Sequence, residues 1–317
     1  MTTTSSATPQ TDSESPGVQV SDGAHTPVAP KQRWSKYHDG GPGTRASVPL
    51  RLVGAVIVAA IFLVPYIVML FGAFKSRSEI LRVPPTYVPA EWQPQNFLTM
   101  WDTPETPLAM NLLSTVVISL GATVLTLLVA LPAAYYTARV RFPGRLAFLF
   151  LVLVTQMLQP AVLVAGLFRQ FLSWGIDDTW LAMILINAAF NMAFATWIMH
   201  AFFASVPHEV DEAAQLDGAS RIQVLFRINL PLVWPGMVTA IIFTFVASWN
   251  EYAASLVILN SPEKQPLPVA LTRFIGQYES SWQYVFGVSL VAIIPVVVVF
   301  ALIEKRLVSG LTAGSVK

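Results

Sequence analysis

Long runs of uncharged, mostly apolar residues alternate with short polar segments over most of the chain. Six such runs span residues 52–74, 109–138, 146–168, 179–203, 236–259 and 285–303, with Glu251 as a single charge in the fifth. A helix of about 20 apolar residues is long enough to cross the hydrocarbon core of a bilayer. The pattern predicts an all-α integral membrane protein with six transmembrane helices.

The polar segments divide the chain into four parts. Residues 1–48 are rich in Ser, Thr, Pro and Gly and show no apolar periodicity, which predicts a disordered tail. Residues 49–108 hold the first predicted span and an external polar loop whose aromatic residues suit a membrane–water interface. Residues 109–303 hold the other five spans, and residues 304–317 form a C-terminal tail.

Composition supports a membrane protein and narrows the chemistry. Hydrophobic residues make up 54% of the chain and charged residues only 12%, whereas about a quarter of the residues of soluble proteins are charged. The net charge of +1 gives no indication of a nucleic-acid partner. The chain has no cysteine, so it has no disulfide, thiolate ligand or cysteine nucleophile, and we find no His or carboxylate spacing typical of a metal site.

The positive charges predict how the chain is oriented. If the N-terminus is cytoplasmic, 13 of the 19 Lys and Arg residues fall on the cytoplasmic side of the six spans and six on the other side. Cytoplasmic loops of membrane proteins carry the excess of Lys and Arg. We therefore expect a multi-pass protein of the bacterial cell membrane, with both termini and segment 206–236 in the cytoplasm.

Segment 206–236 is a polar interruption between the fourth and fifth runs. Pro207 suits the first turn of a helix, and three acids lie between His208 and Glu212, where the positive end of the helix dipole favours them. Gly218 can adopt the left-handed conformation that ends a helix. Ser220 and Gln223 have the spacing of a capping box, which starts a second helix. The segment is predicted to be two short helices that meet at a glycine.

The side chains of this segment indicate an interaction element. We expect Ile222, Leu225 and Phe226 to share one face of the second helix, which Pro231 limits. Ala213 and Ala214 would let the surface of another protein approach the backbone closely.

The spacing of this segment resembles a known family motif. Glu212-Ala213-Ala214 is followed after three residues by Gly218, and after nine more by Ile228-Asn229-Leu230-Pro231. At every fixed position this resembles the cytoplasmic loop of ABC importer permeases. The resemblance covers about residue 109 to the C-terminus and implies a type I ABC importer transmembrane domain. It also implies that a set of loop residues couples to an ATPase: Glu212, Ala213, Ala214, Gly218, Ile228, Leu230 and Pro231.

The same resemblance implies partners. Two permease chains, here expected to be different, would form the pathway, and two cytoplasmic ATPase subunits would bind ATP and Mg. An extracytoplasmic protein would deliver the solute. This chain has no Gly-x4-Gly-Lys-Ser/Thr loop, so we expect a transport subunit that is not an enzyme and binds no cofactor itself.

Two further matches narrow the cargo. Residues 310–317, Gly-Leu-Thr-Ala-Gly-Ser-Val-Lys, look like the tail of carbohydrate permeases of the maltose-type group. Trp249-Asn250-Glu251-Tyr252, followed by Leu267-Pro268-Val269, is also similar to that group. The resemblance implies a sugar or an oligosaccharide as the solute, with a polyol phosphate or another small solute as the alternative.

Polar residues inside the apolar runs are candidates for a solute pathway, because they are costly in lipid and commonly face a watery path. Thr244, Ser248, Glu251 and Ser255 would form one face of a continuous fifth helix. Pro160 is expected to break the third helix. The candidates are Gln156, Gln159, Asn187, Asn191, Ser248, Trp249, Asn250, Glu251 and Tyr252.

Other interpretations remain open from the residues alone. Amide and hydroxyl side chains also join neighbouring helices or bond back to their own helix. An ion-coupled secondary transporter could use Glu251 as its proton-carrying group. An intramembrane enzyme is disfavoured, because the sequence has neither a Gly-x-Ser-x-Gly elbow nor a His-Glu-x-x-His motif.

Overall fold

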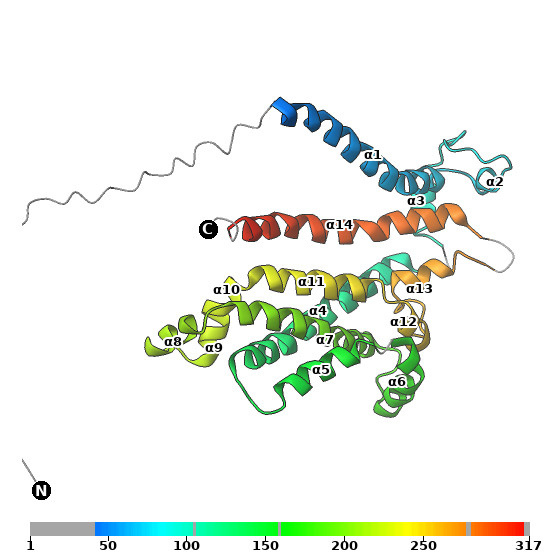
Figure 1. The fold of residues 1–317 in the computed structure, drawn as a ribbon. Helices are drawn as coiled ribbons and strands as arrows, with labels where there is room; N and C mark the ends of the chain where they lie inside the picture. The colour runs from blue at the N-terminus through cyan, green and yellow to red at the C-terminus, as the bar shows by residue number, and fades with distance from the viewer. Residues whose placement is uncertain (1–41, 104–105, 158–159, 277–279, 314–317) are drawn as a thin grey trace, which may run out of the picture. The chain divides into compact units, whose positions relative to one another are not determined.

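The computed structural model describes residues 42–103, 106–157, 160–276 and 280–313, and these residues form two compact units. The first unit, residues 1–59, is described by the beginning of helix α1, Pro42–Ala73. The second unit, residues 60–317, contains the rest of α1 and all later helices (Figure 1). The predicted disordered tail falls largely outside the described residues, but its last part, residues 42–48, is helical.

Four of the predicted spans are single long helices. Besides α1, they are α4, Leu108–Arg139, α7, Trp180–Ser205, and α14, Trp282–Ala313. Among the described residues, these four are long and apolar enough to cross a membrane on their own. Helix α14 continues to Ala313, so residues 304–313 belong to a helix rather than to a separate tail, while residues 314–317 lie outside the described residues.

The third run forms two shorter helices. Helix α5, Arg145–Thr155, ends before helix α6, Pro160–Trp174, begins. The break predicted at Pro160 is confirmed. Proline lacks the backbone N–H that a helix interior needs and disfavours a helical conformation of the preceding residue, so Pro160 suits the first position of α6.

The fifth run is also broken. Helix α11, Trp234–Trp249, stops, and helix α12, Ala253–Ile258, starts after three intervening residues. The expectation of one continuous polar face through Thr244 and Ser255 is therefore wrong. At its other end, α11 joins the short helices before it at an angle of 84°, and together these count as a fifth candidate span.

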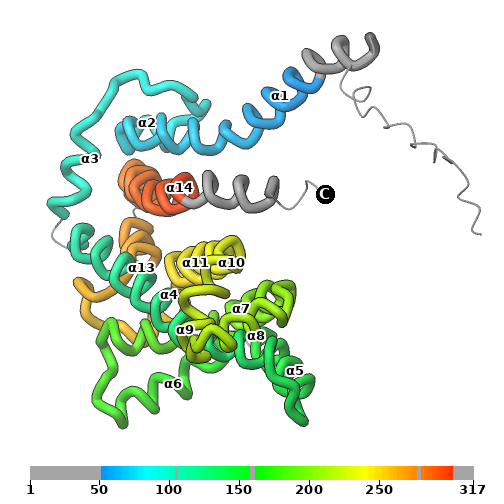
Figure 2. Tube along the Cα trace, turned by 90° about the vertical axis from the view of Figure 1, so that its left-hand side faces the viewer, coloured from blue at the N-terminus to red at the C-terminus, as the bar shows by residue number. Residues whose placement is uncertain are grey.

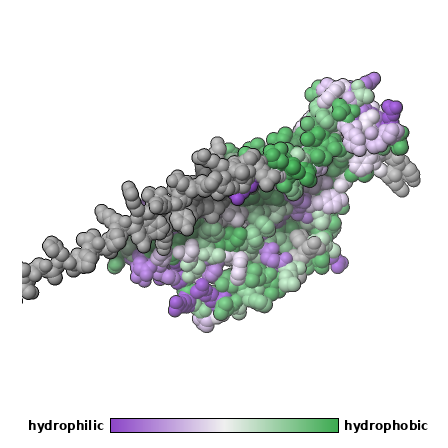
Figure 3. Space-filling view, turned by 45° about the horizontal axis from the view of Figure 1, so that its top comes forward, coloured by the Kyte–Doolittle hydropathy of each residue, from purple (hydrophilic) through white to green (hydrophobic). Residues whose placement is uncertain are grey.

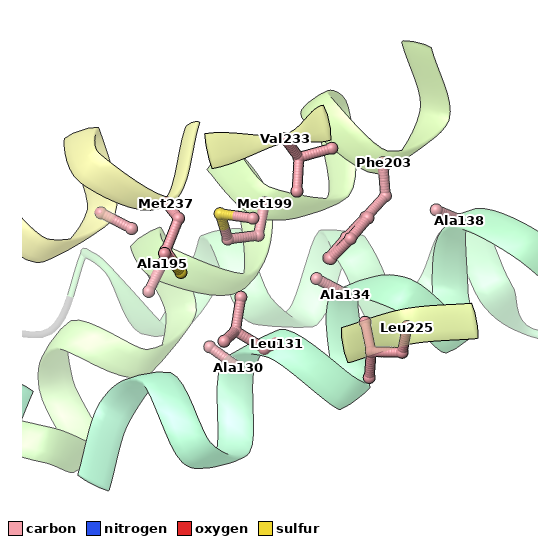
Figure 4. Packing of buried hydrophobic residues seen from close by; sticks show 11 residues of the cluster. Ala130, Leu131, Ala134, Ala138, Ala195, Met199, Phe203, Leu225, Val233 and Met237 are labelled. Atoms are coloured by element: carbon pink, nitrogen blue, oxygen red, sulfur yellow. The ribbon is translucent and has the colours of Figure 1, made fainter. Parts of the chain in front are cut away.

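Helix α4 is the centre of the second unit. It packs along α7 and α11 (Figures 1 and 2), and alanines at every fourth position, Ala130, Ala134 and Ala138, form part of the contact. Small side chains let helices approach closely where lipid provides no hydrophobic drive for association. Figure 4 shows these alanines against Met199 and Phe203 of α7.

Apolar side chains also cover much of the outside of the protein. Figure 3 shows apolar residues over large parts of the visible face. Phe62, Leu128 and Phe150 are examples with more than half of their surface exposed. Such a surface is costly in water but suits the hydrocarbon of a bilayer, as expected for a membrane protein.

The segment after α12 is held against the first turns of α4 and the start of α7. Near the start of α4, Asn111 donates to the backbone oxygens of Pro262 and Gln265 at 2.6 and 2.7 Å. Asp178, just before α7, accepts hydrogen bonds from the backbone N–H groups of Asn260 and Ser261, both at 2.9 Å. These bonds join three segments that are far apart in the sequence.

Asp178 also carries an ion pair and a shifted titration. Its Oδ2 lies 2.9 Å from Lys264 Nζ, and it accepts from the Ser261 hydroxyl. Burial alone would raise the pKa of Asp178, but the hydrogen bonds from Ser261, Lys264 and Asn260 together lower it from 3.8 to about 2. Because these bonds favour the charged form, the ionised carboxylate is the form that stabilises this contact.

We expect Asp178→Asn to lower the free energy of unfolding at neutral pH by about 1.5 kcal/mol, because hydrogen bonds to a charged acceptor are stronger than neutral ones. A group whose pKa is lowered by folding stabilises the protein above its ordinary pKa and loses that contribution as the pH falls. The difference between wild type and variant should therefore be complete above about pH 4 and shrink towards pH 2. Thermal unfolding of the detergent-purified protein across this pH range measures it. Asp177→Asn is the matched control, and a difference that does not depend on pH would contradict the assignment.

Candidate functional site

Segment 206–236 forms two helical stretches on either side of Gly218, as the capping signals predict. The two stretches consist of four short elements. They are α8, His208–Leu216, α9, Arg221–Gln223, the π-helix η2, Val224–Asn229, and α10, Leu230–Leu232. Gly218 has φ +85°, and both hydrogen bonds of the Ser220–Gln223 capping box are present, so these two predictions are confirmed. Elements α9, η2 and α10 follow one another without a break as one helical stretch, Arg221–Leu232, and α8 packs against its η2 part.

The sequence did not predict the π-helix, which changes the face that the second helix presents. Leu225 is buried in the core between α4, α7 and α11, whereas Ile222 is 71% and Phe226 52% exposed. The expectation that these three residues share one face is wrong. A π-helical turn is wider than an α-helical turn, so residues after Gln223 are displaced around the axis relative to those before it.

The loop residues singled out by the family motif divide into exposed and inward-facing groups. Glu212, Ala213, Gly218 and Pro231 are exposed, whereas Ala214 is buried and Ile228 and Leu230 are half-buried. Ala213 thus leaves the backbone open to a partner, as expected, but Ala214 packs inside the loop. The exposure of these residues does not test whether they contact a partner, and their coupling role stays a prediction.

Four large apolar side chains of this polar segment are exposed; Leu232, at 55%, lies at its C-terminal end, and the other three lie nearer to Gly218 in the sequence. Leu216 is 89% exposed, and Ile222 and Phe226 are also mostly exposed. We call these three residues the apolar loop surface. Leu216 precedes Gly218 at the end of α8, and Ile222 and Phe226 follow it in the second helical stretch. Several exposed large apolar residues within one short polar segment are typical of a protein-binding surface.

A buried polar network lies behind this surface, and the sequence did not predict it. Arg139, at the end of α4, forms an ion pair with Asp211 of α8, with Nε 2.9 Å from Oδ2. Arg139 also donates to Asn229 Oδ1 of η2 at 2.9 Å and to the backbone oxygen of Val206 at 2.7 Å. Asp211 in turn accepts from Tyr135 Oη at 2.9 Å and from Asn229 Nδ2 at 2.7 Å.

We call Tyr135, Arg139, Asp211 and Asn229 the Arg139 network. One signal for it exists in the sequence, because an Arg in the last turn of a span precedes a loop that contains several acids. That signal does not identify which acid pairs with Arg139. The network borders a pocket of about 510 Å³ between α4, α8 and α9, whose rim includes Arg141, Glu212 and Arg221.

The solute-pathway candidates lie at several places. Gln156 is exposed at the end of α5 and donates to the backbone oxygen of Phe190, while Gln159 lies outside the described residues. Asn187 and Asn191 are buried on α7 and donate to backbone oxygens one turn back on their own helix. Ser248 is buried on α11. Contact of these residues with solute stays a prediction.

Glu251 occupies the break between α11 and α12. Its carboxylate accepts hydrogen bonds from the backbone N–H groups of Ala254 and Ser255, at 2.7 and 2.9 Å, and from the Ser255 hydroxyl at 2.6 Å. The first N–H groups of a helix have no partner inside it, and a negative charge there is favourable. Glu251 therefore stabilises the start of α12 and explains why the fifth run breaks at this residue.

Two of the pathway candidates do meet in a pocket. Trp249 and Asn250 line a pocket of about 450 Å³ together with Tyr66 of α1, which the sequence analysis did not select. The remaining lining residues are apolar apart from Ser289. Tyr252 is 39% exposed and does not line this pocket.

Comparison with known proteins gives consistent similarities. Residues 127–309 match the family described as "Binding-protein-dependent transport system inner membrane component". The chain is 31% identical over 269 residues to the trehalose/maltose transport system permease protein MalG of Thermococcus litoralis, covering 84% of this chain and 96% of MalG. It is also 31% identical over 269 residues to the sulfoquinovosyl glycerol transport system permease protein SmoH of Agrobacterium fabrum, covering 85% and 94% of the two chains.

A solved structure shares the fold. A chain of a bacterial ABC transporter involved in the import of the acidic polysaccharide alginate matches with a TM-score of 0.69 and 22% identity. The match covers 84% of this chain and 98% of that chain. At this level of identity the likeness is one of fold.

The capping role of Glu251 leads to a local prediction. We expect Glu251→Ala to speed amide hydrogen exchange at Ala254 and Ser255 by about tenfold, because loss of a helix cap typically costs about 1 kcal/mol or more. Glu251→Gln should have a smaller effect, since it retains one acceptor oxygen. Hydrogen exchange of the purified protein, followed by mass spectrometry, measures both. Glu263→Ala, which replaces an exposed acid in the same region, is the control. Equal exchange rates in all of these proteins would contradict the capping role of Glu251.

Proposed function

The chain belongs to the family of binding-protein-dependent transport system inner membrane components, and we propose that it forms half of a pathway for a sugar or an oligosaccharide. Its fold is that of the type I ABC importer transmembrane domain, and it is a multi-pass inner-membrane permease subunit of an ABC importer. As a permease it is a transport subunit rather than an enzyme. The conformational work must come from a partner.

The pocket beside the break in the fifth run supports a carbohydrate as the cargo. Its lining brings the ring of Tyr66 and the indole of Trp249 near the amide of Asn250. Aromatic rings can cover the apolar face of a sugar, and an amide can bond to its hydroxyl groups. The names of MalG and SmoH, each of which transports a sugar or a glycoside, point to the same class.

The alternative cargo, a polyol phosphate, is less well supported by this pocket. None of its lining residues carries a positive charge. A buried phosphate needs paired charges or several hydrogen-bond donors, because an uncompensated charge is costly in a medium of low polarity.

An ion-coupled transporter that uses Glu251 is also disfavoured. Both carboxylate oxygens of Glu251 already accept hydrogen bonds from the start of α12. A proton carrier would have to give up these bonds each time it became protonated. The carboxylate is better explained as a structural cap.

We propose that segment 206–236 docks on a cytoplasmic ATPase. The observation that carries this proposal is the exposure of the apolar loop surface, Leu216, Ile222 and Phe226, which precede and follow the Gly218 turn in the sequence. An apolar centre with a polar rim is the usual form of a protein–protein contact. The exposed motif residues Glu212, Ala213, Gly218 and Pro231 lie in the same segment.

The remaining partners follow from the same proposal. A second, different permease chain completes the pathway, and two ATPase subunits bind ATP and Mg. An extracytoplasmic binding protein delivers the solute. The excess of Lys and Arg on one side supports an orientation with both termini and segment 206–236 in the cytoplasm.

The cargo can be tested in cells that lack this chain. Uptake of radiolabelled maltose, trehalose and glycerol 3-phosphate is compared before and after the chain is restored. We expect restoration of sugar uptake, and a loss of about tenfold when Tyr66→Ala removes the exposed ring of the pocket. Tyr87→Ala, an exposed tyrosine outside the pocket, is the control. Restored uptake of glycerol 3-phosphate alone would contradict the proposed cargo.

Docking can be tested at the turn. Gly218→Asp should abolish uptake and co-purification of the ATPase while membrane insertion persists, because it places a charge beside the apolar loop surface. An added Cβ at Gly218 meets no atom within 4 Å, so internal crowding does not explain a loss. Gly175→Asp is the matched control, since Gly175 also has a positive φ and open space around it. Unchanged co-purification of the ATPase with the Gly218 variant would contradict the proposal that this loop docks on the ATPase.

A further inference from the structure

The Arg139 network joins four segments through one side chain. Arg139 belongs to α4, and its guanidinium group reaches the end of α7 at Val206, helix α8 at Asp211 and the π-helix η2 at Asn229. These contacts lie 67 to 90 residues apart in the sequence. The network therefore connects helix α4 to a loop that follows it only after two further helical segments and α7.

The network is buried and its two charges are paired, although the 2.9 Å contact of Arg139 Nε with Asp211 is an ion pair without hydrogen-bond geometry. The side chains of Arg139 and Asp211 are only 7% and 8% exposed, and Asn229 is fully buried. Taking two charges out of water is costly, and a hydrophobic pair in the same place would often be as stable. What such a pair adds is a defined position of one group relative to the other, because a guanidinium fork and a carboxylate bond in only a narrow range of orientations.

Besides the Arg139 network, the loop is attached to the bundle by the chain itself and by Leu225, which packs in the core between α4, α7 and α11. Its two covalent connections lead into α7 at one end and into α11 at the other. Helix α4 has no such connection, yet it is the helix on which both α7 and α11 pack. Apolar packing is non-directional, so without the polar network a displacement of the loop would be absorbed by sliding at Leu225 and by bending at the two ends of the loop.

Helix α4 also reaches the far end of the unit. Asn111, near its first turn, is bonded to the segment that follows α12, while Arg139 lies in its last turn. A helix of 32 residues is about 48 Å long, at about 1.5 Å per residue. The helix continues through Pro132 as a single element, so it connects the Arg139 end directly to the segment bonded at its other end.

We propose that Arg139, Asp211, Asn229 and Tyr135 are positioning residues that clamp the loop to α4. With the clamp intact, the loop, the end of α7 and α4 move as one body, and ATPase movement is transmitted to the central helix. This inference rests on the proposed docking of the loop on an ATPase. Without the clamp, the loop follows the ATPase while α4 stays behind.

The absence of cysteine from the chain allows a direct test with spin labels. One label is placed at Leu128 on α4 and one at Glu209 on α8, both exposed. Their distance is measured by pulsed electron paramagnetic resonance in the assembled transporter, without nucleotide and after trapping with ATP and vanadate. We expect one narrow distribution that is the same in both states.

The variants separate the clamp from its surroundings. Arg139→Gln should broaden the distribution about twofold and make it differ between the two states, while the ATPase still co-purifies and hydrolyses ATP. Tyr135→Phe, which removes one hydrogen bond, should have a smaller effect in the same direction. Arg141→Gln and Tyr136→Phe are matched controls at exposed neighbouring positions and should leave the distance unchanged.

The outcomes distinguish this inference from the proposed function. If Arg139→Gln does not fold, the double variant Arg139→Gln/Asp211→Asn removes both charges and leaves no unpaired ion in the interior. An unchanged narrow distribution in the variants, or a distance that already changes in the wild type, would overturn the clamp. If no ATPase co-purifies with the wild type, the docking proposal fails, and the nucleotide-free comparison of wild type and variants still tests the clamp.

Discussion

The absence of water from the hydrocarbon core is the constraint on which the rest of this structure depends. An unpaired backbone group there is so costly that the chain must be helical wherever it is exposed to lipid. Breaks in a helix are tolerated only where side chains supply the missing hydrogen bonds. At the break after α11, Glu251 supplies them for the first N–H groups of α12.

Helix α4 shows how polarity is managed inside such a bundle. Thr115, Ser119 and Thr123 are buried, and each hydroxyl donates to the backbone oxygen four residues earlier. These residues are polar in composition but present small, satisfied surfaces to the neighbouring helices. The next stretch of α4 uses alanines for the same purpose. Full charges are confined to the end of the helix, where Arg139 and Asp211 neutralise each other.

The sequence predicted features that depend on neighbouring residues and missed those that depend on distant ones. Run length indicated α1, α4, α7 and α14, and local capping rules predicted the Gly218 turn and the Ser220–Gln223 box. The break at Pro160 was also predictable, because it follows from the chemistry of one residue. Family resemblance identified the loop, but its partner contacts stay predictions.

The failures share a physical cause. A window of apolar residues cannot show that Glu251 will bond to the next helix rather than lie on a continuous face. The π-helical turn contains both Leu225, which is buried, and Phe226, which is exposed. It depends on the packing of Leu225 against helices that are distant in the sequence. The Arg139–Asp211 pair requires knowledge of which helix ends meet in space. For Asn187 and Asn191, residue type alone could not distinguish a pathway from helix packing, and the structure buries both.

The π-helical turn has a consequence for how this protein can vary. It carries Asn229 to the buried side, where its amide bonds the Asp211 carboxylate. Deletion of a single residue between Val224 and Asn229 would rotate the amide by about 100° around the helix axis. Substitutions on the exposed side of this turn would leave the buried network in place, whereas an insertion or a deletion within the turn would not. Among related proteins, the number of residues in this stretch should vary less than their identities.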